Sequence, residues 1–291
     1  MPSIPTVRTV AELRASIGDA RTAGARVALV PTMGALHAGH LSLIERAAAS
    51  ADFVVASIFV NPTQFAPNED FQAYPRDEAR DVALLASAGC RLVYAPSTQT
   101  IYPPGFSTTV SVAGVTAPLE GAQRPTHFAG VATVVAKLLI QAGPDFAVFG
   151  EKDYQQLQVI RRLARDLDLP IEIVSAPTLR DRDGLALSSR NAYLTAAHRQ
   201  VAPALHRALE RAAGEIAAGN PVTEVENTAV AGLLEAGFDS VDYFEARGPS
   251  DLERLGPGPI TTPARLLTAA RLGKTRLIDN LGVTPTRPPI P

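Results

Sequence analysis

The sequence predicts an α/β protein in which a doubly wound parallel sheet is followed by a smaller α+β domain. Up to about Ser175, short apolar runs alternate with amphipathic stretches of helical length. The runs are nearly continuous in Val, Ile, Ala and Phe, which is typical of parallel strands buried on both faces. After Arg190 this alternation stops and alanine-rich helical patterns begin. We therefore expect two domains, at residues 1–178 and 179–291.

The elements of the parallel sheet follow from these patterns. Its strands are predicted at residues 26–30, 53–60, 91–95, 145–149 and 171–175. Amphipathic stretches predict helices at residues 39–49, 76–88, 128–141 and 153–167. Prolines and glycines interrupt the alternation at residues 102–121, where the alternating run at residues 108–113 predicts one or two extra strands.

The second domain is expected to combine helices with a small antiparallel sheet. Thr195 can cap a long alanine-rich helix that reaches about Ala218, and another helix is expected at residues 222–236. Strands are predicted at residues 241–246, 264–272 and 275–281. The proline-rich tail at residues 284–291 predicts disorder, and the Pro, Asn and Glu content of residues 66–74 predicts a mobile loop.

Composition is that of a soluble globular enzyme and excludes several other classes. Hydrophobic residues make up 46% and charged residues 19%, unlike a disordered chain. The formal net charge of −2 gives no global attraction to nucleic acid or an anionic membrane, and Arg161–Arg162 resemble a solvated helix face. The single cysteine, Cys90, excludes a disulfide framework and a cysteine-based zinc site within one chain. We expect Cys90 to be a small buried hydrophobe.

The cellular location is expected to be the cytoplasm. Residues 1–10 contain prolines and no continuous apolar stretch, so they do not resemble a signal peptide. No apolar run has the length needed to span a bilayer. We expect small molecules, rather than nucleic acid or a membrane, as partners.

Two histidines stand three residues apart where the first strand meets a helix. His37 and His40 end the run Pro-Thr-Met-Gly-Ala-Leu-His-Ala-Gly-His. Unpaired N–H groups and the positive end of the helix dipole attract phosphate there, and imidazole donors can stabilise charge that develops on it. The alternatives are two structural histidines that cap a turn, or a zinc site. No further His or Cys stands nearby at ligand spacing, which disfavours zinc.

Polar side chains also follow the second strand. Asn61 and Gln64 supply amides that can bind a carboxylate and hydroxyls without adding charge. The alternative for this segment is an ordinary Asx/Pro turn.

The strand at residues 145–149 is followed by a second group of candidate ligands. Gly150 permits close backbone approach, and Lys152 supplies a point charge suited to phosphate. Asp153 can bind ribose hydroxyls or cap the next helix. Gln156 falls one turn later toward the same cleft, whereas Glu151 by itself indicates a solvated surface charge.

The last group follows the final strand of the first domain. Ser188, Ser189 and Arg190 offer two hydroxyls and a guanidinium, which together can clamp phosphate oxygens. A serine nucleophile would need a general base and an oxyanion hole, and the chain has no Gly-x-Ser-x-Gly motif.

Together, these stretches resemble the pantothenate synthetase (pantoate–β-alanine ligase) family of the His-x-Gly-His nucleotidyltransferase superfamily. The likeness extends from about Arg26 to Asn280. Its motifs are Pro31-Thr32-Met33-Gly34, His37-Ala38-Gly39-His40, Ser57-Ile58-Phe59-Val60-Asn61-Pro62 with Gln64-Phe65, Tyr74-Pro75-Arg76, Leu119-Glu120-Gly121, Arg124-Pro125, His127-Phe128, Gly150-Glu151-Lys152-Asp153, Leu187-Ser188-Ser189-Arg190 and Arg276-Leu277-Ile278-Asp279-Asn280.

The resemblance implies a Rossmann-like first domain, a C-terminal lid and a homodimer. It assigns the catalytic role to His40, with His37, Lys152 and Arg190 around the phosphates. The residues it assigns to ATP are Met33, Gly34, Ala35, Leu36, His37, Ala38, Gly39, His40, Gly150, Glu151, Lys152, Asp153, Leu179, Leu187, Ser188, Ser189 and Arg190. It assigns pantoate to Asn61, Gln64 and Gln156, with Gln64 also near β-alanine.

The resemblance leaves two points open. Thr63 stands where family members often have methionine, which can alter the lining of the pocket. The helix after His127 is expected at the dimer interface, or is a plain core helix.

The reaction implied is the ATP-dependent ligation of (R)-pantoate and β-alanine to pantothenate. It passes through pantoyl adenylate and releases pyrophosphate and AMP. Mg²⁺ would be bound mainly by the ATP phosphates, because the sequence has no dense carboxylate cluster and predicts no metal site of the protein's own. The alternatives are a nucleotidylyltransferase that transfers AMP to a phosphorylated acceptor, and a non-catalytic nucleotide sensor.

Overall fold

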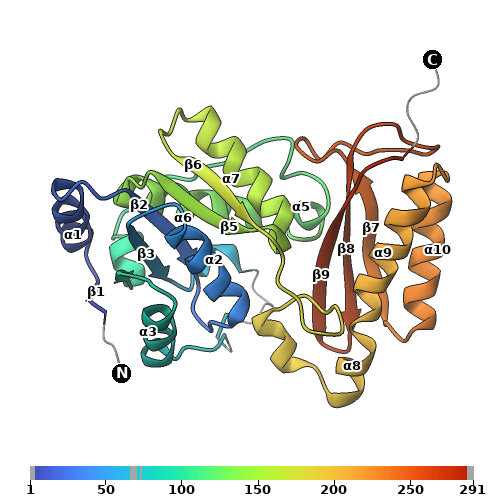
Figure 1. Ribbon diagram of the computed structural model, residues 1–291, viewed down its shortest axis with the longest axis horizontal. Helices are drawn as coiled ribbons and strands as arrows, with labels where there is room; N and C mark the ends of the chain where they lie inside the picture. Colours follow the sequence, from blue (N-terminus) through green and yellow to red (C-terminus); the bar gives the residue numbers. More distant parts are fainter. Residues whose placement is uncertain (1–3, 66–70, 73, 287–291) are drawn as a thin grey trace. The chain divides into compact units, whose positions relative to one another are not determined.

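The computed structural model describes residues 4–65, 71–72 and 74–286. The chain forms two compact units (Figure 1). The first unit comprises Met1–Glu151 and Gln155–Pro177, and the second comprises Lys152–Tyr154 and Thr178–Pro291. Most of the predicted mobile loop at residues 66–74 and the end of the predicted tail, residues 287–291, lie outside the described residues.

The first unit is built on a parallel sheet, which confirms the predicted α/β fold. In the described part of the chain this sheet has six strands in the order β1-β4-β3-β2-β5-β6, all parallel. The strands are β1 Thr6–Val7, β2 Val27–Thr32, β3 Phe53–Ile58, β4 Leu92–Tyr94, β5 Phe146–Gly150 and β6 Glu172–Ala176. The five longer ones are those predicted; the two-residue strand β1 was not expected.

The strand order reverses between β2 and β5. From β2 the chain adds β3 and then β4 on one side, and it later returns to place β5 against the other side of β2. In open parallel sheets the crevice at the carboxyl ends of two such strands is where ligands bind. The segments that follow β2 and β5 are therefore the first places to look for a site.

Helices cover both faces of this sheet. The α-helices of the first part of the chain are α1 Val10–Thr22, α2 Ala38–Ala48, α3 Glu78–Ser87, α4 Thr98–Ile101, α5 Glu120–Gln123, α6 His127–Ala142 and α7 Tyr154–Asp166. Ala28 and Val30 of β2 lie in one core cluster with Ile44 of α2 and Leu85 of α3. Alternate residues of β2 face the other side, where α6 contacts the strand. Cys90 is 2% exposed, as predicted.

The extra strands predicted within residues 102–121 are absent from the described residues. The main-chain N–H of Val110 donates to Thr133 Oγ1 of α6 at 2.9 Å instead of to a neighbouring strand. The main-chain N–H of Val110 is therefore paired with a helix that is distant in the sequence, a tertiary contact that a local pattern does not reveal.

The second unit combines helices with a small antiparallel sheet, as predicted. Its described residues include a three-stranded sheet in the order β7-β8-β9. The strands are β7 Ser240–Arg247, β8 Ala264–Leu272 and β9 Thr275–Val283, and the helices are α8 Ala196–Val201, α9 Ala204–Ala217 and α10 Val222–Glu235. Helices α9 and α10 pack against each other and against this sheet, and they bury Leu205, Leu209 and Leu266 (Figure 1).

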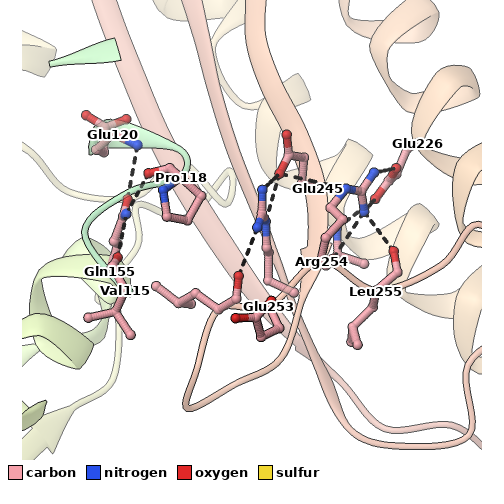
Figure 2. A network of polar contacts seen from close by, with 12 residues as sticks. Val115, Pro118, Glu120, Gln155, Glu226, Glu245, Glu253, Arg254 and Leu255 are labelled. Carbon is pink, nitrogen blue, oxygen red and sulfur yellow. Dashed lines mark hydrogen bonds and ion pairs between the residues drawn. The ribbon is translucent and has the colours of Figure 1, made fainter. Parts of the chain in front are cut away.

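The single long helix predicted from Thr195 to about Ala218 is wrong, because it is two helices. Thr195 does cap α8, where its side chain accepts the N–H of His198. However, Pro203 has no N–H to donate within a helix, and α9 begins directly after it. Downstream, Glu226 of α10 is 5% exposed and binds the N–H of Ala246 and the guanidinium of Arg254 (Figure 2).

The described part of the predicted tail and the described helices each add one observation. Thr286, in the predicted disordered tail, donates its N–H to the Ala217 carbonyl at 3.0 Å. Among the described residues, no helix is long and apolar enough to cross a membrane.

Candidate active site

The loop between β2 and α2 is held by the buried carboxylate of Asp81. Gly34 and Ala35 have positive φ angles of 78° and 53°, which turn the chain sharply. The N–H of Ala35 donates to Asp81 Oδ2 at 2.8 Å, and the N–H of Leu36 donates to Oδ1 at 2.9 Å. A Cβ at Gly34 would lie 2.9 Å from Asp81 Oδ2. Glycine is therefore required there both by φ and by the close approach of the carboxylate.

Asp81 belongs to α3 and was not found by sequence reasoning. It is 1% exposed. Burial raises the pKa of Asp81, whereas the hydrogen bonds from Leu36 and Ala35 lower it. A signal was present, because Asp81 stands four residues before the buried Leu85 on the apolar face of its helix. An acid at such a position needs a hydrogen-bonding partner.

The two histidines cap α2 reciprocally. His37 is the N-cap residue, and its Nδ1 accepts the N–H of Gly39 at 3.1 Å. His40 Nδ1 accepts the N–H of His37 at 3.4 Å, and the two ring centroids lie 4.1 Å apart. This is the geometry of a capping box, with imidazoles in place of the usual hydroxyl and carboxylate. The capping alternative considered from the sequence is therefore present in the structure.

Capping does not exclude phosphate binding by the same rings. Since each Nδ1 accepts a main-chain proton, the neutral form of each imidazole has its own proton on Nε2. The Nε2–H edge is the donor edge of the ring. In both rings Nδ1 therefore helps to fix the start of α2, and the neutral ring has its own proton on the opposite nitrogen.

Asn61, three residues after the end of β3, is a buried hydrogen-bonding centre. It is 1% exposed, and its Oδ1 accepts from Tyr102 Oη at 2.8 Å and from Thr63 Oγ1 at 3.0 Å. Its Nδ2 donates to Gln64 Oε1 at 3.1 Å and to the Gly130 carbonyl at 3.2 Å. Sequence reasoning did not select Tyr102 as a site residue. Burial raises the pKa of its hydroxyl. The Thr63 hydroxyl joins this group, which a methionine could not do.

Gln64 is oriented from both ends. Its Nε2 lies 2.9 Å from Met33 Sδ, and its main-chain carbonyl accepts from Arg124 and His127 at 3.2 and 2.9 Å. Gly130 allows α6 to approach the main chain of Thr63 closely, because a Cβ at this position would lie 2.4 Å from the Thr63 carbonyl oxygen. The Asx/Pro turn considered from the sequence is present at Asn61, whose side chain accepts the N–H of Thr63.

The start of α7 supports the neighbouring loop. Gln155 is 4% exposed, and its Nε2 donates to the carbonyls of Val115 and Pro118 at 2.9 and 2.7 Å (Figure 2). Its Oε1 accepts the N–H of Glu120 at 3.0 Å. The next residue, Gln156, is half-buried. Sequence reasoning selected Gln156 and missed Gln155, whose contacts lie far away in the sequence.

Lys152 and Asp153 belong to the second unit. Lys152 Nζ lies 3.8 Å from Asp153 Oδ1, and the carboxylate is 49% exposed, so the ion pair is weak. The Lys152 carbonyl accepts from Asn280 Nδ2 at 2.9 Å. Glu151 is half-buried rather than fully solvated, which corrects the interpretation made from the sequence.

A small hairpin precedes the serine pair. Leu187 donates its N–H to the Leu179 carbonyl at 2.9 Å, and Arg180 and Ala186 form an antiparallel bridge. Ser188 then caps the 3₁₀ turn Ser189–Tyr193, where its Oγ accepts the N–H of Arg190 at 3.3 Å.

The predicted site residues thus fall into two sets, one in each unit. The first unit holds Met33, Gly34, Ala35, Leu36, His37, Ala38, Gly39, His40, Asn61, Gln64, Gly150, Glu151 and Gln156. The second unit holds Lys152, Asp153, Leu179, Leu187, Ser188, Ser189 and Arg190. Within the described residues, no group of three or more His, Cys, Asp or Glu side chains could hold a metal ion.

Comparison with known proteins gives a consistent result. A family model described as Pantoate-beta-alanine ligase matches residues 5–282. A protein named pantothenate synthetase from Caulobacter vibrioides is 61% identical over 284 residues, which cover 97% of this chain and 100% of that protein. One from Paramagnetospirillum magneticum is also 61% identical over 284 residues, covering 97% of this chain and 99% of that protein.

Solved structures agree. The crystal structure of pantothenate synthetase from Thermus thermophilus matches with a TM-score of 0.90 and 49% identity, covering 97% of this chain and 100% of that one. The pantoate-β-alanine ligase from Francisella tularensis, complexed with β,γ-ATP and β-alanine, matches with a TM-score of 0.78 and 34% identity, covering 96% and 97% of the two chains.

Proposed function

The chain belongs to the pantoate–β-alanine ligase family, and we propose that it is an enzyme that ligates (R)-pantoate to β-alanine through a pantoyl adenylate, with ATP as the source of energy. The observation that supports this most directly is the match over nearly the whole chain. The loop with His37 and His40 follows a strand at the reversal of strand order, where such sheets bind their ligands.

The first step is adenylation. One pantoate carboxylate oxygen attacks the α-phosphorus of ATP in line, and the bond from that phosphorus to pyrophosphate breaks. Nε2–H donors of His37 and His40, with the charges of Lys152 and Arg190, stabilise the negative charge that develops on the phosphates. Ser188 and Ser189 donate hydroxyl hydrogen bonds to the same oxygens. The chain therefore acts by positioning and charge stabilisation, without a covalent enzyme intermediate.

Pantoate is bound by neutral amides. Gln64 and Gln156 offer donors and acceptors for a carboxylate and hydroxyls. Asn61, the third residue of this predicted set, is buried with its amide bonded within the chain, and it contributes by holding Gln64. Their orientation is supported by the contacts of Asn61 with Tyr102 and Gly130. In this arrangement Gln64 also borders the β-alanine position.

The second step transfers the acyl group. The β-alanine amine attacks the acyl carbon of pantoyl adenylate, and the carbon–oxygen bond to AMP breaks. The amine loses a proton and AMP keeps the bridging oxygen. Amide formation thus uses the free energy of the anhydride made in the first step.

Mg²⁺ is proposed as a partner of the ATP phosphates rather than of a protein cage. When bound, it neutralises phosphate charge. Lys152 and Arg190 supply charge for the remaining phosphate oxygens.

Two further features belong to this proposal. The protein is a homodimer in the cytoplasm, where ATP is supplied. Helix α6 is buried along most of its length within one chain, as a core helix would be, but its Ile140 is 57% exposed and offers an apolar contact to a second copy. Sedimentation at several protein concentrations tests the dimer, and a monomer at all of them would contradict it.

Product analysis tests the reaction. Mass spectrometry is applied after the protein is mixed with Mg-ATP and pantoate, with and without β-alanine. We expect pantothenate and AMP with β-alanine, and enzyme-bound pantoyl adenylate without it. If folded, ATP-binding protein releases no pyrophosphate in response to pantoate, the substrate assignment is wrong, and phosphorylated AMP acceptors become the substrates to screen.

A further inference from the structure

Two neighbouring residues of β9, Asp279 and Asn280, bind the segments that hold the candidate phosphate ligands of the second unit. Asp279 is 4% exposed and Asn280 is 2% exposed. Both belong to the motif Arg276-Leu277-Ile278-Asp279-Asn280, to which the proposed reaction gives no role. Their side chains make specific contacts with two separate parts of the chain.

Asp279 holds the hairpin that leads to Ser188. Arg180 donates from Nη1 to Asp279 Oδ2 at 2.6 Å and from Nη2 to Oδ1 at 2.9 Å. This bidentate pair is well shielded, with side chains 18% and 2% exposed. Arg180 Nη1 also donates to the Gly184 carbonyl at 3.1 Å, at the tip of the hairpin. The segment from Leu179 to Ser188 is thereby fixed to the third strand of the sheet.

Asn280 holds the main chain of Lys152. Its Nδ2 donates to the Lys152 carbonyl at 2.9 Å, and its Oδ1 accepts from Arg265 Nε at 2.7 Å. The Arg265 guanidinium lies 4.1 Å from the centre of the Tyr154 ring. Tyr154 Oη donates to the Pro249 carbonyl at 2.9 Å. Residues Lys152–Tyr154 group with the second unit, whereas Glu151 and Gln155 group with the first.

We propose that Asp279 and Asn280 are positioning residues that keep Lys152 and the segment Leu187–Arg190 in one rigid body. This inference rests on the proposed function, because it matters for catalysis only if Lys152 and Arg190 bind phosphate. With both segments attached to β9, the main chain at Lys152 and the hairpin that leads to Ser188 keep a constant separation. Neither residue has to touch the substrate for this.

Two substitutions test the two links separately. Asn280→Asp keeps the oxygen that accepts from Arg265 but replaces the donor to Lys152 with a second oxygen, which repels the carbonyl. Asp279→Asn breaks the bidentate pair with Arg180. The matched control is Asp242→Asn, because Asp242 of β7 also pairs with an arginine of β9, Arg276, at 2.6 Å, but contacts neither segment.

Hydrogen exchange measured by mass spectrometry gives a readout that is independent of activity. We expect faster exchange at residues 152–154 in Asn280→Asp and at residues 179–190 in Asp279→Asn, with neither change in Asp242→Asn. Unchanged exchange in both test variants, or the same changes in the control, would overturn the proposal. If Asp279→Asn does not fold, Arg180→Lys tests the same link, since lysine keeps the charge but loses the bidentate fork.

Kinetics then connect the links to the reaction. Asn280→Asp and Asp279→Asn should each lower kcat for pantoate-dependent pyrophosphate release by about 10–100-fold, as misplacement by about 1 Å can do. The pantoate KM should stay within about twofold, because the pantoate residues belong to the other unit. In a Lys152→Ala background, Asn280→Asp should cause little further loss.

If Asn280→Asp lowers kcat by its full factor in the Lys152→Ala background as well, Asn280 does not act through Lys152. The proposed function is judged by a different result. If Lys152→Ala alone leaves kcat unchanged, the phosphate role of Lys152 is wrong, while the exchange data still decide whether Asn280 holds its segment.

Discussion

The two units present their candidate ligands in different ways. In the first unit, His37, His40, Asn61 and Gln64 follow the carboxyl ends of β2 and β3, so the parallel sheet itself brings them to one edge. In the second unit, Lys152 lies two residues after the end of β5 and Ser188 follows a small hairpin, so neither follows a strand of the antiparallel sheet. They are connected to it by the side chains of Asn280 and Asp279, the latter through Arg180.

This difference indicates how the candidate ligands of each unit can be displaced. Where ligands follow buried strands, the main chain is already fixed, and a few buried polar groups adjust it. Where ligands lie on loops, side chains of a separate sheet must fix the main chain. Substitutions in the first unit should therefore affect either pantoate binding or phosphate chemistry, according to the ligand that they displace, whereas substitutions in the second should affect phosphate chemistry alone. A second-unit variant that raised the pantoate KM would break this comparison.

The largest effect is expected at His40. His40→Ala removes a donor that stabilises charge on the phosphates, and it should cost about 3–4 kcal/mol in the barrier, on the order of 10²–10³ in kcat. The measurement is the rate of pantoate-dependent pyrophosphate release. His198→Ala, in α8 of the second unit, is the matched control. Turnover near that of the wild type in His40→Ala would show that the histidine only caps α2.

Asp81→Asn should give the next largest effect. An asparagine can accept only one of the N–H groups of Ala35 and Leu36, and a buried donor without a partner costs about 1–3 kcal/mol. We expect kcat to fall by about 10–100-fold with little change in the pantoate KM. Asp77→Asn, at the exposed N-cap of the same helix, is the control. If kcat falls equally in Asp81→Asn and Asp77→Asn, a general disturbance of α3 causes the fall, rather than loss of the Asp81 carboxylate.

The same variant should change the pH dependence of stability. Burial raises the pKa of Asp81 in the folded chain; nearby Arg80 lowers it and Asp77 raises it. Stability is therefore lost as the pH rises from the pKa of the unfolded chain to that of the folded chain. Asp81→Asn lacks this loss, so its free energy of unfolding relative to wild type should increase with pH across that range. Denaturant titrations at several acidic pH values measure it, and a decrease would contradict the assignment.

Gly130→Ala should act on pantoate rather than on ATP. A Cβ there would overlap the Thr63 carbonyl oxygen at 2.4 Å and push the segment that holds Asn61 and Gln64. We expect the pantoate KM to rise by about tenfold, as loss of about 1.4 kcal/mol of binding would give. Gly214→Ala, where the Cβ meets nothing within 4 Å, should instead stabilise its helix by about 0.5–1 kcal/mol. An unchanged pantoate KM in Gly130→Ala would remove Asn61 and Gln64 from the pantoate site.

The smallest effect is expected for Thr63→Val. This substitution keeps the side-chain shape but removes the hydroxyl that bonds to Asn61 and Tyr102. One such hydrogen bond contributes about 0.5–1.5 kcal/mol, so the pantoate KM should rise by several-fold at most. Steady-state kinetics with varied pantoate measures this change. A loss as large as that of Gly130→Ala would show that Thr63 itself contacts the substrate.

The fold could be predicted well because its signals are local. The buried strands of the first unit appear as continuous apolar runs, and the break between α8 and α9 had a signal in Pro203. The prediction failed for residues 108–113, because the partner of Val110 is Thr133 on a distant helix. The helix α1 was overlooked although Thr9 and Glu12 form a capping box.

In the candidate site, the sequence could predict only the residues that would contact a bound molecule. Residues that would touch a substrate lie in motifs that the resemblance identifies, whereas residues that hold them depend on contacts across the chain. Asp81 lies 45 residues from Leu36, and Asn280 lies 128 residues from Lys152. No local pattern links such pairs, so the structure is needed to assign them.

The central claim is that the pantoate carboxylate attacks the α-phosphorus of ATP. It is tested most directly with pantoate labelled with ¹⁸O in both carboxylate oxygens, in the presence of unlabelled ATP and β-alanine. Our account predicts that the AMP produced contains one ¹⁸O atom, because the bridging oxygen of the adenylate leaves with AMP. Mass spectrometry that finds unlabelled AMP beside newly formed pantothenate would contradict the adenylate route.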